Sequence, residues 1–311
     1  MEKRRNGLLE IYRFILCFWP MYHHNFFFFT KGDKFSLAEL AVDFFFVISG
    51  FFLLRSMEKK KDEHILRSAF KLMVDRVRPF AFTLRFIAAF NFICVALFIR
   101  EDHFKLLFEL FKYWWYVLYL TIAIGIFYLL YRLIKNKKIF GVLLFVVALS
   151  MGAFHYCLDE MGLYIYEFTF VARTFGCIAF GMLMSYIPNI KVKRFNPSLL
   201  VVIALVPTIF YLAYNEKTYV TRLLMLGLFA ALVYFTYNVS IGGRFFDLLG
   251  KLSTRMYLYM SFVTMFHALG LTNHRILFVI DVTMAIMDLS LTTYREKYLA
   301  LKKQIKEKAT L

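Results

Sequence analysis

The sequence predicts an all-α, polytopic transmembrane bundle of about ten helices. The 311-residue chain is 61% hydrophobic and only 19% charged, and its mean hydropathy is +0.62. A soluble domain of this length would need more polar residues to cover its surface. Its apolar residues fall into separate runs, most of them near the ~20 residues that cross a bilayer. We therefore expect one integral-membrane domain over residues 1–311, not a soluble enzyme, a disordered chain or a secreted disulfide scaffold.

The apolar runs are continuous and do not alternate with period two, which favours helices over barrel strands. The basic start of the chain leads into the first run without a small-residue cleavage site, so we expect that run to be retained as a span. The ten expected spans are residues 8–29, 36–54, 79–99, 111–131, 139–155, 168–188, 198–214, 220–240, 253–271 and 276–294.

The loops between these spans differ in charge. With ten spans and the N-terminus inside, 27 of the 38 Lys and Arg residues fall in inner segments and 9 in outer ones. Because cytoplasmic loops carry excess Lys and Arg, both termini are expected in the cytoplasm, with 295–311 as a basic, solvated helical tail. The net charge of +17 then reflects topology and attraction to anionic membrane lipids, not nucleic-acid binding. An anionic ligand on the inner face is the functional alternative.

Cysteine usage indicates no metal site. Cys17, Cys94, Cys157 and Cys177 lie in or beside apolar runs and have no CxxC spacing. This pattern is typical of small buried side chains between helices, and it predicts neither zinc binding nor a disulfide framework.

Ionisable residues inside the first span point to a site, because such groups are costly in the membrane unless they face a cavity or a partner. Arg13 and His24 are 11 residues apart, three helical turns, so they project from one face about 16 Å apart. His23 points about 100° away from that face. The structural alternative for a membrane histidine is an interhelical hydrogen bond.

The second span carries Asp43, Ser49 and Gly50. Asp43 either orients a nearby histidine or neutralises Arg13. Short side chains permit close helix packing, which is the simpler role for Ser49 and Gly50, although Ser49 is also a candidate substrate-binding residue.

Other polar and aromatic residues have two interpretations each. Trp115 belongs to an aromatic group that is either an interfacial belt or a platform for sugar stacking. Glu167 and Arg173 form either an ion pair or a polar acceptor site. Asp281 and Asp288 are seven residues apart on one helix face, where they either line the cavity or pair with Arg85.

Several motifs together resemble the acyltransferase 3 family of membrane O-acyltransferases. The opening signature is Arg13-x10-His24 followed by the stretch from Val42 to Phe51. In order, the further matches are Arg76-Val77-Arg78-Pro79, Trp114-Trp115-Tyr116-Val117-Leu118, Phe180-Gly181-Met182-Leu183, and Leu249-Gly250-Lys251-Leu252-Ser253 with Tyr257-Leu258. The resemblance covers about residues 8–300.

This resemblance implies transfer of an acyl group, most often acetyl from acetyl-CoA, to a hydroxyl of a cell-envelope polysaccharide at the bacterial cytoplasmic membrane. It implies no tightly bound cofactor: the acyl-CoA is the donor substrate, and a glycan or lipid-linked saccharide is the acceptor. His24 is the expected general base, or it forms an acyl-histidine, with Arg13 binding the reacting oxygens. Lys71, Arg76 and Arg78 are expected near the CoA phosphates.

Two departures from the family pattern leave other functions open. Met260 stands where the family usually has a histidine, and Leu72 and Met73 precede the basic turn where Arg or Lys is frequent. The alternatives are a transporter or flippase, whose buried charges would mark a substrate path, and an inactive relative that serves as a scaffold. The sequence shows no convincing symmetry between its halves, which a transporter would favour.

Overall fold

The computed structural model describes residues 6–22, 37–58, 64–98, 115–160, 166–188, 201, 203–206, 208–209, 219–237, 242–260, 262, 265–266, 269–271 and 273–309. In this part of the chain every named element is helical: α1 (Gly7–Tyr22), α2 (Leu37–Met57), α3 (Ile65–Val77), the 3-10 helix η2 (Arg78–Phe80), α4 (Ala81–Phe98), α6 (Trp115–Leu133), α7 (Lys137–Glu160), α8 (Tyr166–Ser185), α10 (Tyr219–Tyr237), α11 (Arg244–Tyr259) and α13 (His274–Ala309). The all-helical class is thus confirmed.

Six helical stretches in the described residues are long and apolar enough to cross a membrane: Glu39–Met57, Ile65–Leu97, Trp115–Leu133, Lys137–Phe154, Phe168–Ser185 and His274–Leu299. A shorter apolar helix covers Leu223–Tyr237. The protein is therefore an integral membrane protein by length and hydropathy, while the count of ten spans and the side of the termini stay predictions.

Helix boundaries differ from the expected spans where a helix is amphipathic. We expected a span over 253–271, but α11 already begins at Arg244. Its first turns combine the exposed Phe245 and Leu248 with the buried Gly250, so a hydropathy window underestimates this helix. The third expected span, 79–99, is preceded by α3, and Pro79 lies in the short 3-10 turn that joins α3 to α4.

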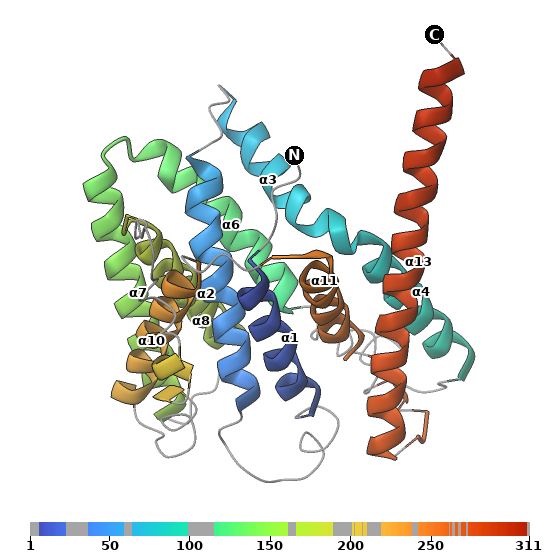
Figure 1. Cartoon of the computed structure of the whole chain (residues 1–311). Helices are drawn as coiled ribbons and strands as arrows, with labels where there is room; N and C mark the ends of the chain where they lie inside the picture. Colours follow the sequence, from blue (N-terminus) through green and yellow to red (C-terminus); the bar gives the residue numbers. More distant parts are fainter. Residues whose placement is uncertain are drawn as a thin grey trace.

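Helix α2 lies at the centre of the bundle, next to α1 and α8 (Figure 1). Within its membrane-length window 78% of the residues are buried, against 17% for α7. The apolar run of α2 has little amphipathic character because both faces of the helix meet other helices. Its neighbours α1, α8 and α10 complete the core around Phe44, Phe46 and Phe51.

Two glycines bring α2 and α8 into backbone contact. A Cβ atom added at Gly50 would overlap the carbonyl oxygen of Ile178, and one added at Gly181 would overlap the carbonyl oxygen of Val47. Small residues allow such close approach in membranes, where packing takes over part of the role of hydrophobic burial. The contact therefore fixes the positions along α2 and α8 at which the two helices cross.

A buried ion pair joins the same two helices nearer their N-terminal ends. Arg173 of α8 donates its Nε hydrogen to Asp43 of α2 at 2.5 Å, and its Nη2 donates to the carbonyl oxygen of Glu39. The thiol of Cys177 also lies 3.4 Å from the Asp43 carboxylate. Because Asp43 meets Arg173 early in both helices and Gly181 meets α2 later in both, α2 and α8 run parallel.

A second buried ion pair attaches α13 to the bundle. Asp288 lies 3.3 Å from Nε of Arg255 on α11 and accepts hydrogen bonds from Thr83 of α4 at 2.5 Å and from Thr292 at 3.0 Å. The expected partner, Arg85, is instead exposed on α4. Asp281, seven residues before Asp288 on the same helix face, is fully buried. One carboxylate thus links three helices, and its partner is not Arg85, which was one of the two alternatives for this residue.

We expect Gly50→Ala to destabilise the folded protein by about 1–3 kcal/mol, because the added methyl group meets backbone that cannot rotate away. Thermal unfolding of the detergent-solubilised protein measures this. Gly141→Ala on α7 is the matched control: its Cβ would meet nothing within 4 Å, and alanine is the better helix former. Equal melting temperatures for Gly50→Ala and the wild type would contradict the described crossing.

We expect Asp43→Ala to cost about 3–5 kcal/mol of stability, because it leaves the Arg173 guanidinium buried without its carboxylate. The double variant Asp43→Leu with Arg173→Leu removes both charges and is expected to be more stable than the single variant. The same thermal assay applies. If the double variant were no more stable than Asp43→Ala, the ion pair would not couple α2 to α8.

Candidate functional site

Arg13 is held between α1 and α11. Its Nη1 donates to the Glu10 carboxylate at 3.0 Å, one helical turn earlier, and its Nη2 donates to Oγ1 of Thr254 at 3.0 Å. Glu10 is buried, and its carboxylate occupies the space that a side chain at Gly250 would need. The guanidinium is therefore held at two nitrogens while about a quarter of its side chain stays accessible, 26%.

Helices α2 and α6 bring further polar groups to this arginine. Tyr116 of α6 lies near Ser49 of α2 and within electrostatic range of Arg13 and Arg76. The Ser49 hydroxyl also donates to the carbonyl oxygen of Phe45 at 2.8 Å. Tyr116 packs against Tyr257 of α11 at a centroid distance of 5.1 Å. We call Arg13, Ser49, Arg76 and Tyr116 the arginine–tyrosine cluster; it joins α1, α2, α3 and α6.

Three of the sequence-predicted binding residues lie on or beside α3. Arg76 is partly buried in its last turn, whereas Lys71 and Arg78 are exposed. Arg13, Ser49 and Arg76 thus all lie near Tyr116, whereas Lys71 and Arg78 lie at the surface of the same helical segment.

Asp43 and Arg173 lie together in the ion pair between α2 and α8. We had expected Asp43 either to neutralise Arg13 or to orient a histidine. In the structure Glu10 pairs with Arg13, and Asp43 pairs with Arg173. His24 lies outside the described residues, so the second role stays a prediction, as do the same-face relation of His24 to Arg13 and the placement of His23.

The candidate acceptor residue Trp115 begins α6 and packs against α8, the helix that carries Glu167 and Arg173. Trp115 stacks on Phe170 with ring centroids 3.9 Å apart, so one face of the indole is covered by protein. Phe46 and Tyr119 contribute two further ring contacts. Glu167 lies in the first turn of α8, but its side chain is outside the described part.

Sequence reasoning missed several partners in this region. Glu10 precedes Arg13 by three residues, a spacing at which helical side chains meet, so the pair was available from the sequence. Thr254 and Arg255 gave no comparable signal, because their contacts with Arg13 and Asp288 join helices far apart in the chain. Tyr116 was noted as part of an aromatic group, and its hydroxyl contact with Ser49 depends on the tertiary fold.

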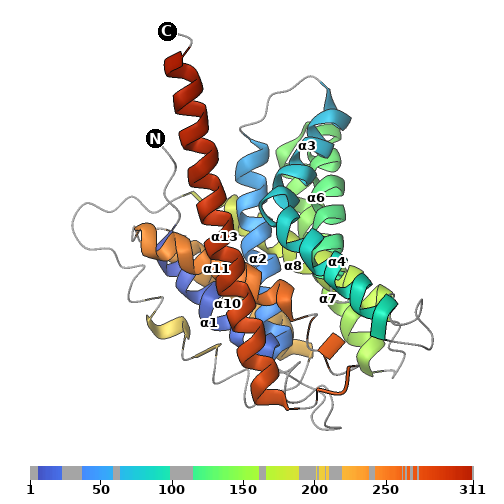
Figure 2. The same ribbon diagram turned by 90° about the vertical axis from the view of Figure 1, so that its right-hand side faces the viewer.

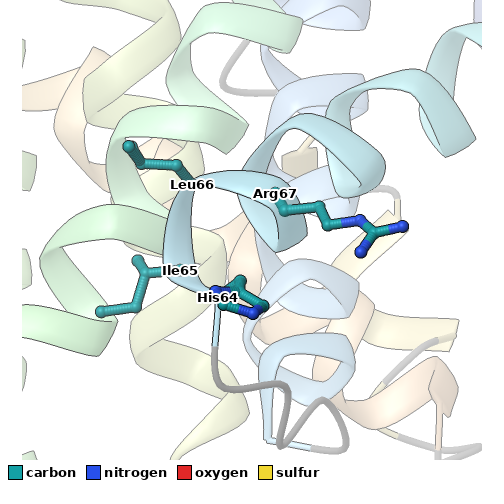
Figure 3. Close-up of a pocket in the computed structure, with 4 residues that line it drawn as sticks. All are labelled: His64, Ile65, Leu66 and Arg67. Atoms are coloured by element: carbon teal, nitrogen blue, oxygen red, sulfur yellow. The ribbon is translucent and has the colours of Figure 1, made fainter.

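A shallow hollow at the start of α3 is separate from these predicted residues. It is lined by His64, Ile65, Leu66 and Arg67, and Figure 3 shows Arg67 pointing away from the two aliphatic side chains. His64 precedes the first turn of α3 without a side-chain capping hydrogen bond. None of the four is a predicted site residue, and we assign the hollow no part in the site.

Comparison with known proteins supports the reading of these motifs. No curated protein and no solved structure matches the chain. A family model described as an acyltransferase domain matches residues 6–294, nearly the whole chain, including every helix of the arginine–tyrosine cluster. The chain therefore belongs to the acyltransferase 3 family.

Proposed function

We propose that this membrane acyltransferase moves an acyl group, chiefly acetyl, from acyl-CoA to a hydroxyl of a cell-envelope polysaccharide. The family match over residues 6–294 carries the proposal. The arrangement around Arg13 supports it, because a guanidinium held by Glu10 and Thr254 keeps a fixed orientation while part of it stays accessible. Preorganised donors of this kind are what a developing oxyanion requires.

The proposed reaction is a direct acyl transfer. His24, as a neutral imidazole, takes the proton of the acceptor hydroxyl while the hydroxyl oxygen attacks the thioester carbonyl carbon. The carbonyl oxygen gains negative charge, which Arg13 and the Tyr116 hydroxyl stabilise. The carbon–sulfur bond then breaks, and the CoA sulfur leaves as a thiolate that recovers the proton from His24. An acyl-His24 intermediate is the covalent variant of this route.

The donor is proposed to approach along α3. Exposed Lys71 and Arg78 suit the CoA phosphates, since both can form charge-assisted hydrogen bonds at the surface. Arg76, which is partly buried and within electrostatic range of Tyr116, suits the pantetheine end of the donor. The thioester would then reach the arginine–tyrosine cluster.

The acceptor is proposed to bind beside Trp115. Trp115 is the proposed platform for sugar stacking, and Glu167 offers a hydrogen-bond acceptor for saccharide hydroxyls. Arg173, fixed by Asp43 and Glu39, would position this part of α8 or contact the saccharide.

The first prediction separates the two adjacent histidines. His24→Ala should insert and fold normally but lose acyl transfer by about 10²–10⁴-fold, as expected for removal of a general base. His23→Ala, the matched control, should keep most of its activity. Transfer of radioactive acetyl from acetyl-CoA by purified, reconstituted protein is the measurement. An inactive His23→Ala beside a fully active His24→Ala would reverse the assignment.

A second prediction concerns Tyr116. Tyr116→Phe keeps the ring packing and removes the hydroxyl, so transfer should fall by roughly 10-fold or more, as for loss of one oxyanion donor, with little change in stability. Tyr128→Phe on the same helix is the control, because the buried Tyr128 hydroxyl has no hydrogen-bond partner among the described residues. If both variants transferred acetyl at the wild-type rate, Tyr116 would have no part in the reaction.

We also propose ten spans with both termini in the cytoplasm, in a bacterial cytoplasmic membrane. The partition of 27 inner against 9 outer Lys and Arg residues supports this topology. Compartment-sensitive reporters fused after Lys31 and after Leu311 are expected to give opposite signals. Signals from the same side would contradict ten spans with both termini in the cytoplasm.

A further inference from the structure

The C-terminal part of α13 carries an apolar stripe that is exposed among the residues that the structure describes. Helix α13 continues to Ala309, and its C-terminal turns stand clear of the other helices in both views (Figures 1 and 2). Its exposed apolar residues recur at alternating spacings of three and four: Leu291, Tyr294, Tyr298, Leu301 and Ile305, each 55–72% exposed. This 3.5-residue period is the a/d pattern of a coiled coil, and we call these five residues the α13 stripe.

Much of the stripe lies beyond the reach of the membrane. A run of charged residues begins at Arg295, and Glu296 pairs with Lys251 of α11 at the exposed surface, which puts the membrane boundary near Tyr294. At 1.5 Å per residue, Leu301 and Ile305 lie roughly 10 and 16 Å further along the axis. The headgroup layer of one leaflet is only about 5–8 Å thick. These two side chains therefore need a protein cover.

The helix cannot bend back to bury the stripe in the bilayer. Sharp kinks arise at proline, at glycine or serine pairs, or at π-bulges. The sequence from 274 to 309 has no proline or glycine, and the structure describes it as one continuous α-helix.

The flanks of the stripe decide which kind of partner fits. In the heptad, Arg295 and Lys302 occupy e positions and Lys297 a g position, and all three are exposed. Two copies in one membrane would place their α13 helices parallel, which sets Lys297 of one copy against Lys302 of the other. Like charges at these positions disfavour self-pairing. A helix with Asp or Glu at its e and g positions would complement the same flanks.

We infer that the α13 stripe is a docking surface for a cytoplasmic amphipathic helix of another protein, with an apolar a/d seam and acidic flanks. The surface is independent of the acyl-transfer site, because Arg13, Ser49, Arg76 and Tyr116 lie on α1, α2, α3 and α6. It provides a route by which a cytoplasmic partner is held at the membrane beside the enzyme.

The test uses the full-length protein in its native membrane. A photo-crosslinking amino acid replaces Leu301, and mass spectrometry identifies the joined peptide. Leu299 is the matched control site: it is also an exposed leucine, at 53%, but it points about 160° away from Leu301 around the helix. At position 301 we expect an adduct with a segment of another protein that has apolar a and d positions and acidic e and g positions. At position 299 we expect little adduct.

Charge reversal gives the second readout. Lys297→Glu with Lys302→Glu is expected to lower the adduct yield roughly tenfold, because attractive flank pairs become like-charge pairs. Lys135→Glu with Lys138→Glu, at the exposed turn between α6 and α7, makes the same change in net charge elsewhere and should leave the yield unchanged. An adduct with a second copy, an adduct with lipid alone, an adduct insensitive to Lys297→Glu with Lys302→Glu, or no adduct at 301 would each overturn the inference.

Discussion

The close contact between α2 and α8 is the constraint on which the rest of the structure depends. Gly50 and Gly181 let the two backbones meet, and the Asp43–Arg173 pair fixes the same helices nearer their N-terminal ends. Helices α1 and α10 then pack on α2, and α7 on α8. Because lipid supplies no hydrophobic force between helices, such packing and buried polar contacts have to set the arrangement.

The same contact explains two of the motifs that first suggested the family. Gly50 lies in the stretch from Val42 to Phe51, and Gly181 lies in the stretch from Phe180 to Leu183. At each glycine the backbone of the other helix passes through the space that a Cβ atom would need. Gly250 has a different reason: the Glu10 carboxylate, which holds Arg13, fills its side-chain space. Glycines in these motifs therefore serve packing and the orientation of one arginine.

The helical class, the membrane character and the family could be predicted from the sequence, because continuous apolar runs and ordered motifs are local signals. The partners of the buried charges could not. Asp43 pairs with Arg173, 130 residues away, and Asp288 pairs with Arg255, not with Arg85. Such pairs depend on which helices become neighbours. The start of α11 at Arg244 was missed because an amphipathic helix dilutes its own hydropathy signal.

The central claim, that this membrane protein transfers acyl groups from acyl-CoA to envelope polysaccharide, is tested most directly by following the acetyl group itself. Membrane vesicles containing the protein would be given acetyl-CoA labelled in the acetyl group, and the polysaccharide fraction would be isolated and treated with mild base. We predict base-labile label in the polysaccharide, in excess over vesicles that lack the protein. Label confined to acetyl-CoA and free acetate, with the protein present and folded in the membrane, would contradict the account.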